Sequence, residues 1–189
     1  MINIKLGNWN KVEAITFISV IIAIIVNAIL THDAFPALIS AICGITYVTL
    51  AGKGTPLCYI IGLIGTFFYS AMAFQHSLWG HLAIYVLYYI PMQFLGFILW
   101  NKNLQKNKDV IVKKKLTNKE RLLYLAISII AILLLICILY KLKDAHPVLD
   151  GITTIFSFLG MYFTVKRCIE QWISWMIVNT LSLLMWTFY

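Results

Sequence analysis

The 189-residue sequence has few charged side chains, few acids and no spacing typical of a metal site. Only 12% of its residues are charged and 61% are hydrophobic, a composition that excludes an ordinary soluble domain. Neither a disulfide framework nor a metal site is predicted, because the cysteines lie in or beside apolar runs without a C-x-x-C spacing. We expect all four to pack as small apolar side chains: Cys43, Cys58, Cys137 and Cys168.

The seven acidic residues are too scattered to run a reaction inside a membrane. No two of them are placed to form a buried acid pair, and neither H-E-x-x-H nor G-x-S-x-G occurs. Glu13, Asp150 and Glu170 are predicted in the first turn of a helix, where the positive end of the backbone dipole favours an acid. The other four are predicted in loops: Asp33, Asp109, Glu120 and Asp144. The sequence therefore predicts no enzyme, no catalytic residue and no cofactor.

Hydrophobic residues gather in seven runs of membrane-spanning length. They cover about 12–30, 35–51, 56–74, 79–100, 121–140, 147–166 and 168–189. The pattern predicts an all-α integral membrane protein with seven transmembrane helices, in which residues 1–189 form a single transmembrane domain. We divide that domain into a first three-helix unit, a linking helix, a basic cytoplasmic loop and a second three-helix unit: 12–74, 79–100, 101–120 and 121–189.

The basic residues lie almost entirely on one side of this arrangement. If the amino terminus is inside, Lys141 and Lys143 are the only two of the 15 basic residues on the outer side. Positive charge concentrates in cytoplasmic loops, so the amino terminus is predicted in the cytoplasm and Tyr189 outside. We also expect the basic loop to contact anionic lipid head groups.

Prolines and tryptophans refine the helix map. Pro91 lies inside the linking helix, so a kink is predicted there, with the carbonyl near Leu87 freed for another partner. Four tryptophans fall near predicted helix ends, where indoles prefer the level of the lipid head groups. We therefore assign these four to the aromatic belt: Trp9, Trp79, Trp100 and Trp186.

One stripe of aromatic and polar side chains follows a single face of the last predicted helix. Its spacing of i, i+3 and i+7 aligns Trp172, Trp175 and Asn179. Asn179 falls near the middle of the bilayer, where an unpaired carboxamide is costly. One interpretation is that Asn179 joins helices together; the other is a pocket for a flat polar ring, with indole stacking and amide hydrogen bonding.

Other uncharged polar residues also lie at mid-depth, and Gln93, beside Pro91, is the hardest to explain by packing alone. Such a set suits a neutral solute or one with a delocalised positive charge better than a proton or sodium relay. The remaining members are Thr66, Tyr69, Ser70, Tyr88, Tyr89, Thr153, Thr154 and Ser157.

A weak internal repeat relates the two three-helix units. A shift of 114 residues aligns His32 with His146, Lys53 with Arg167 and Thr66 with Thr180, and it superimposes the hydrophobic runs. Four spans separate equivalent helices, so both units must point the same way. The sequence therefore predicts a 3+1+3 arrangement of parallel repeats with a solute site near the midplane.

Three segments of the chain resemble the PnuC family of bacterial vitamin transporters. The run Glu170-Gln-Trp-Ile-Ser-Trp-Met-Ile-Val-Asn179 is similar to the family's E-Q-W-x-x-W-x-x-x-N signature, and residues 88–100 and 149–154 are similar to its fourth-helix and sixth-helix segments. The resemblance implies a SWEET-like architecture of opposite orientation. It also implies uptake of nicotinamide riboside across the bacterial cytoplasmic (inner) membrane by facilitated diffusion, with metabolic trapping by cytoplasmic phosphorylation.

Carried over by position, the resemblance implies substrate contacts at Trp172, Trp175, Asn179 and Gln93. Weaker candidates for the same role are Tyr47, Tyr69, Asp150 and Thr153. One departure is the segment 58–62, where an aromatic residue followed by a glycine is expected and the chain has Cys58 and Gly62.

Other functions remain open at this point. The family also transports thiamine and other vitamins, such as riboflavin, so the substrate is less certain than the fold. A non-transporting membrane scaffold is a further alternative, although it would not need aromatic and amide groups at mid-depth. The resemblance makes a homotrimer worth testing, and lipid and a small solute are the expected partners, with no nucleic acid.

The charge distribution generates a prediction about topology. An enzyme reporter that works only outside the cytoplasm should be active when fused after Tyr189 and inactive when inserted in the 102–120 loop. Activity in whole cells measures this directly. The reverse pattern would mean that the seven-span arrangement with a cytoplasmic amino terminus is wrong.

Overall fold

The computed structural model describes residues 9–77, 79–102, 104–105, 108–111 and 114–188. Its chain divides into two compact units, residues 1–112 and 113–189. Each unit is described by itself. Nearly all of the described residues are helical, as the sequence predicts.

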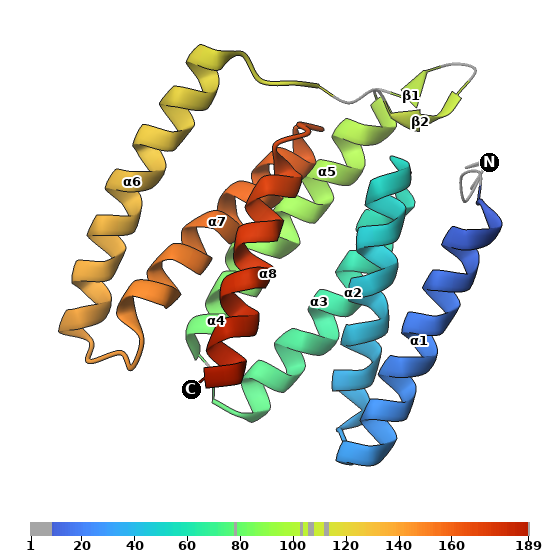
Figure 1. Ribbon diagram of the computed structural model, residues 1–189, viewed down its shortest axis with the longest axis horizontal. Coiled ribbons are helices and arrows are strands. Elements are labelled where there is room, and N and C mark those ends of the chain that lie inside the picture. Colours follow the sequence, from blue (N-terminus) through green and yellow to red (C-terminus); the bar gives the residue numbers. More distant parts are fainter. Residues whose placement is uncertain (1–8, 78, 103, 106–107, 112–113, 189) are drawn as a thin grey trace. The chain divides into compact units, whose positions relative to one another are not determined.

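The first unit is built on three antiparallel helices followed by an interrupted fourth (Figure 1). α3 packs against both α2 and the fourth helix, so it lies at the centre of this unit. The elements are α1 (Lys11–Thr31), α2 (Phe35–Lys53), α3 (Leu57–Gln75), α4 (Trp79–Ile84), the π-helical turn η1 (Tyr85–Tyr89), α5 (Ile90–Lys102), β1 (Leu104–Gln105) and β2 (Lys108–Ile111).

The second unit is a three-helix arrangement in which α7 packs against both of its neighbours. Its helices are α6 (Asn118–Lys141), α7 (Pro147–Val165) and α8 (Gln171–Phe188). Each of the seven predicted hydrophobic runs thus corresponds to helical structure, with the fourth formed jointly by α4, η1 and α5.

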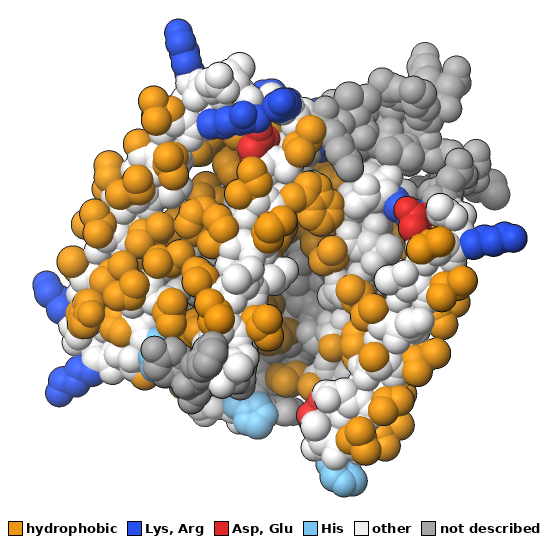
Figure 2. Space-filling view, in the orientation of Figure 1, with side chains coloured by type: hydrophobic (Ala, Val, Ile, Leu, Met, Phe, Trp, Pro, Cys, Tyr) orange, Lys and Arg blue, Asp and Glu red, His pale blue; other side chains and the backbone are white. Residues whose placement is uncertain are grey.

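The surface of the helices is apolar along their length. Six of them, counting Trp79–Lys102 as one, are long and apolar enough to cross a membrane. α8 is not among these six, and its sequence mixes Gln171, Asn179 and three tryptophans with aliphatic residues. Figure 2 shows hydrophobic side chains along the helices and Lys and Arg side chains at helix ends. A bilayer is the solvent that suits such a surface.

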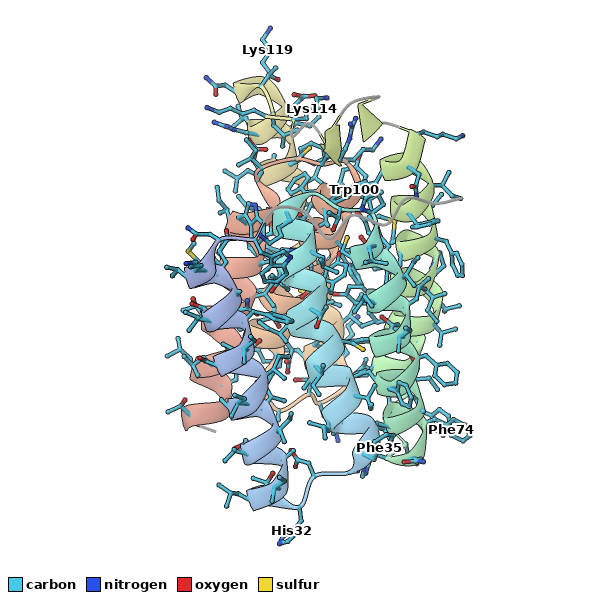
Figure 3. The ribbon with its side chains drawn as sticks, turned by 90° about the vertical axis from the view of Figure 1, so that its right-hand side faces the viewer. His32, Phe35, Phe74, Trp100, Lys114 and Lys119 are labelled. Atoms are coloured by element: carbon cyan, nitrogen blue, oxygen red, sulfur yellow. The ribbon has the colours of Figure 1, made fainter. Side chains whose placement is uncertain are left out.

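Within the predicted basic loop, β1 pairs with β2 in an antiparallel arrangement. Two local predictions are wrong. Trp100 is not a belt residue, because it is only 2% exposed and its ring meets Tyr59 edge-on at 5.1 Å. In Figure 3, Trp100 lies toward the opposite end of the first unit from His32, Phe35 and Phe74. Glu120 is not in a loop but in the first turn of α6.

The other three tryptophans assigned to the aromatic belt differ in their surroundings. Trp79 is 60% exposed, as a belt residue should be. Trp9 lies under the Lys53 ammonium, 4.5 Å from the ring centre. The side chain of Trp186 lies outside the described residues. Three cysteines are fully or partly buried as predicted, but Cys137 is exposed on α6, so packing within the chain does not explain it.

Pro91 is accommodated by a change of helix type. The π-helical turn Tyr85–Tyr89 lies just before it, and the Ile90 amide donates to the carbonyl of Tyr85. A π-turn takes an extra residue into the helix and is a known cause of helix irregularity. It carries three tyrosines, and the ring of Tyr89 contacts the rings of both Tyr85 and Tyr88.

The two units repeat the same local landmarks. In each, an acid three residues after the N-cap bonds back to the N-cap amide: Glu13 to Asn10 at 3.0 Å and Glu120 to Thr117 at 2.8 Å. Each second helix begins with a proline, Pro36 or Pro147. Left-handed residues follow the first and second helices at His32 and Gly54 in one unit, and at Lys143 and Arg167 in the other.

The turn between α7 and α8 is tied to the segment 114–117, which we call the strap. The Lys114 amide donates to the carbonyl of Arg167 at 2.8 Å, and the Ile169 amide donates to the carbonyl of Lys114 at 2.9 Å. The Glu170 carboxylate then accepts the Leu116 amide at 3.2 Å and the Arg121 guanidinium at 2.7 Å. Glu170 is therefore more than the helix-dipole residue that the sequence predicts.

Protonation of Glu170 should weaken this end of the second unit. Burial raises the pKa of its carboxyl, but the bonds from Arg121 and the Leu116 amide outweigh burial and hold the pKa below the ordinary 4.5. A lowered folded-state pKa contributes stability that is fully present above the unfolded pKa and is lost as the pH falls through the folded one.

We therefore expect Glu170→Gln to melt below the wild type at neutral pH, with a gap that narrows once the pH drops below about 4.5. Thermal unfolding of purified protein over a pH series measures the gap. A gap of constant size down to the lowest pH would show that the charge of Glu170 contributes nothing.

Candidate functional site

The most distinctive polar group of the first unit is the amide of Gln93. Its side chain projects from α5, only 5% of the residue is exposed, and its Nε2 donates to the Thr66 hydroxyl on α3 at 2.6 Å. No described residue donates to its Oε1. In the opposite amide orientation Thr66 would donate and the nitrogen would be left over, so one polar atom of Gln93 needs a partner either way.

Tight aromatic packing surrounds this amide. A Cβ added at Gly62 would lie 2.8 Å from the Tyr47 ring and 3.0 Å from the Gln93 Oε1. Only glycine at that position lets the ring and the amide approach α3. Tyr47 in turn meets the ring of the buried Tyr59 edge-on at 6.1 Å. The structure therefore brings two predicted site residues, Tyr47 and Gln93, to the same point on α3.

Two further buried hydroxyls lie on α3 without a partner among the described residues. The first is Tyr59, which is 0% exposed, and the second is Ser70, which is 9% exposed. Tyr59 packs so closely on Gly96 of α5 that a Cβ there would overlap its ring. A buried hydroxyl without a partner is costly, so both residues are unusual in the interior of this unit.

Tyr69 lies farther along α3, and its ring already stacks on another aromatic residue. Its ring stacks on Tyr85 of η1 with centres 4.1 Å apart and planes 21° from parallel. One face of Tyr69 is thus covered by the π-turn. A solute could stack only on its other face.

In the second unit, α7 holds Trp175 in one orientation. The indole Nε1 donates to the Thr164 hydroxyl at 3.3 Å, and that hydroxyl donates to the carbonyl of Gly160 at 2.7 Å. A Cβ at Gly160 would lie 2.9 Å from the indole, so one face of the ring is packed against α7. The opposite face is the one on which a planar solute could stack.

The other predicted residues of the second unit differ in their surroundings. Trp172 is half-buried and Asn179 is exposed on α8. Thr153 donates to the carbonyl of Leu149 at 2.9 Å, so its proton is used within α7. Asp150 lies in the first turn of α7, as predicted.

Sequence reasoning missed the residues that hold this site in place. It identified Gln93 and Trp175 but not their supports Gly62, Gly160 and Thr164. The spacing Gly160-x-x-x-Thr164 was an available signal, since small residues four apart allow close helix packing in membranes. Ring stacking and glycine contacts between helices cannot be read from one segment alone.

A cavity in the first unit lies away from all these residues. It has a volume of about 360 Å³ and is lined by residues of α1, of α2 and of the link between them, among them Ala28, Asp33, Ala37 and Ala41. None of the predicted site residues lines it. The candidate contacts of each unit are therefore individual side chains, none of which lines this cavity.

Comparison with known proteins identifies the relatives of this chain. The family model described as nicotinamide mononucleotide transporter matches residues 34–189. The nicotinamide riboside transporter PnuC of Neisseria mucosa is 30% identical over 95% of this chain and 70% of its own length. The PnuC protein of Haemophilus influenzae is 30% identical over 95% of this chain and 80% of its own.

A solved structure agrees with these sequence matches. The crystal structure of the vitamin B3 transporter PnuC superimposes with a TM-score of 0.81 at 30% identity, covering 95% of this chain and 78% of the other. These proteins are transporters rather than enzymes. The resemblance seen in the sequence is confirmed, and the chain belongs to the nicotinamide mononucleotide transporter family, as a multi-pass membrane protein related to the PnuC transporters.

Proposed function

We propose that this protein imports nicotinamide riboside into the bacterial cytoplasm by facilitated diffusion, with phosphorylation inside the cell trapping the solute. The proposal draws on the named substrate of two relatives at 30% identity. It also draws on the aromatic and amide groups carried by α3, α5 and α8. Phosphorylation adds charge to the riboside, which would prevent its return by the same path.

The observation that carries the proposal is the unpaired amide atom of the buried Gln93. A buried polar group without a partner is expensive, and chains keep such groups where a ligand completes them. Nicotinamide riboside carries a carboxamide and ribose hydroxyls, any of which could pair with this amide. We assign Trp172 and Trp175 to the pyridinium ring, which indoles attract through cation–π contact.

Asn179 supports the same assignment. It is exposed on α8, in the middle of a helix that we take to span the bilayer. A carboxamide facing hydrocarbon would cost several kcal/mol. We therefore infer that this face of α8, with Trp175 one turn earlier and Trp172 two turns earlier, borders a solute path rather than lipid. Tyr47, Tyr69, Asp150 and Thr153 are secondary candidates.

The charge distribution favours the riboside over its phosphorylated form. A bound phosphate is normally held by Arg or Lys. In this sequence no Lys or Arg lies between residues 12 and 52, 54 and 101, 122 and 140, or 144 and 165. A solute with a single delocalised positive charge suits such an interior better than a mononucleotide does.

We further propose the 3+1+3 arrangement of parallel repeats, SWEET-like with opposite orientation, and a cytoplasmic amino terminus. The capping acids, prolines and left-handed residues that recur in both units support the repeat. The bacterial inner membrane is the proposed location, and a homotrimer is the proposed assembly, on the strength of the family resemblance.

Replacing Gln93 should separate binding from stability. We expect Gln93→Leu to weaken nicotinamide riboside binding about tenfold, because a hydrogen bond to a buried group is lost. Its melting temperature should stay the same or rise, because an unsatisfied polar atom leaves the interior. Titration calorimetry and thermal unfolding on purified protein measure the two effects.

Asn101→Leu is the matched control for this substitution. Asn101 is an exposed amide on the same helix and donates to the carbonyl of Phe97 at 2.8 Å. Its replacement should leave binding unchanged. A Gln93→Leu variant that loses stability and binding in parallel would identify Gln93 as a packing residue instead.

Transport in liposomes should show equilibration without accumulation. Every acid in the sequence lies in a loop, in strand β2 or near a helix end, so no acid at depth can carry a coupling proton or gather oxygen ligands around sodium. Inside the liposomes, labelled nicotinamide riboside should reach the outside concentration and no more, whether a proton gradient or a sodium gradient is imposed. Asp150→Asn should slow entry without changing the end point.

Thiamine and riboflavin tested beside nicotinamide riboside distinguish the alternatives. Preferential entry of either vitamin would move the assignment to that solute. Equal signals in protein-free and protein-containing liposomes for all three would favour a scaffold. Accumulation of the solute above its outside concentration, abolished by collapsing the proton or the sodium gradient, would contradict facilitated diffusion. Asp150 would then be the first candidate for the coupling residue.

A further inference from the structure

An ion pair with a buried carboxylate lies directly before Trp172 and Trp175 of α8, and the side chain of its Arg121 is 42% exposed. Glu170 is 8% exposed, and its Oε1 accepts from both Nε and Nη2 of Arg121, at 3.0 and 2.7 Å. The same carboxylate accepts the Leu116 amide of the strap. One side chain thereby joins three segments: the strap, the first turn of α6 and the start of α8.

The backbone of Glu170 is at the same time the first acceptor of α8. Its carbonyl accepts the amides of Ile173 and Ser174 at 3.1 and 3.3 Å. Glu170 therefore anchors α8 to the strap through its side chain, and its carbonyl accepts amides of the first turn of that helix. A helix fixed at this position by a two-nitrogen contact cannot rotate about its axis without breaking that contact.

The tryptophans follow within five residues of this anchor. Trp172 comes two residues after Glu170, and Trp175 comes five residues after it. Trp175 is held from the other side by the Thr164 hydroxyl and by the Gly160 contact. The orientation of α8 is thus defined by an anchor at its start and by a packed indole little more than one turn later.

The rest of the turn supports the anchor. Leu116 is buried with Phe163 and Cys168, and Tyr124 and Tyr162 pack against them. The two tyrosine hydroxyls lie 3.3 Å apart, linking α6 to α7. Arg167, before the anchor, takes the left-handed conformation (φ 62°) that glycine takes at position 54 in the first unit. Left-handed backbone is costly for arginine, and here its carbonyl accepts the Lys114 amide.

From these contacts we propose that Glu170 and Arg121 are positioning residues for transport, which set the rotation of α8 and so the stacking geometry of Trp172 and Trp175. The proposal rests on the proposed function, because it assigns the pair a role in binding the same solute. Burying the carboxylate of an ion pair is a costly way to begin a helix when a serine or aspartate cap suffices. Its value here is the fixed orientation that a binding site requires.

The first unit offers a matched control. Lys53 and Glu13 form an ion pair of the same 2.7 Å length at the corresponding end of that unit. The Glu13 side chain is 54% exposed, against 10% for Glu170. Glu13 lies on α1, which carries no candidate substrate contact, and its partner Lys53 is the last residue of α2, which carries Tyr47. Glu13→Gln therefore removes a comparable ion pair without disturbing α8.

The test compares the binding of nicotinamide riboside to purified full-length variants by titration calorimetry, at a temperature where thermal unfolding shows each to be folded. Glu170→Gln and Arg121→Gln should each raise the Kd about tenfold, because small misplacements of contacting groups are costly. The Kd of the double variant should be no higher than that of the weaker-binding single variant, because each of the three loses the same contact between Glu170 and Arg121. Arg121→Lys keeps the charge without the two-nitrogen contact and should fall between wild type and Arg121→Gln.

The outcomes separate the inference from the proposed function. Wild-type Kd values in all Glu170 and Arg121 variants, with lowered melting temperatures, would overturn the inference and leave the pair a structural one. An equal rise of Kd in Glu13→Gln would overturn it as well. A wild-type protein that binds none of nicotinamide riboside, thiamine and riboflavin would overturn the proposed function, and the inference with it.

Discussion

Hydrocarbon offers no hydrogen bonds, and the arrangement of polar groups in this protein depends on that constraint. Most hydroxyls at depth bond to their own helix, as Thr46 does to Ile42 and Thr153 to Leu149. Gln93 departs from this pattern because its partner is on another helix and one of its amide atoms is still unpaired. Of the unpartnered buried groups, Gln93 is the one to which we assign a function.

Contacts between an aromatic ring and a glycine bring the helices close enough for such groups to meet. Tyr47 packs on Gly62 in the first unit, and Trp175 packs on Gly160 in the second. Without a hydrophobic force between helices in lipid, close packing of this kind is a main source of their association. It also orients the rings, because each ring is held against the backbone of a neighbouring helix.

The ends of the helices follow a different rule, since water and lipid head groups can satisfy polar groups there. Charged residues gather at these ends. In the first turn of the first helix of each unit, an acid accepts a hydrogen bond from the N-cap amide. The Glu170 and Arg121 pair differs from the others because its carboxylate is buried within the turn. Local charge at a helix end is expected from sequence, but the Leu116 amide of the strap and the Arg121 side chain of α6 come from 54 and 49 residues before Glu170.

The sequence by itself determined the helices, because hydrophobic runs of bilayer length leave a backbone few other ways to pair its amides. It also identified Gln93, Trp172, Trp175 and Asn179, since polar and aromatic residues at mid-depth stand out against aliphatic neighbours, and its resemblance indicated the family. Only the tertiary structure decided that Trp100 is buried, that Pro91 follows a π-turn, and that Glu170 is bound by Arg121 and the strap. These features depend on which side chains of distant segments come into contact, and that information is not contained in the periodicity of any single helix.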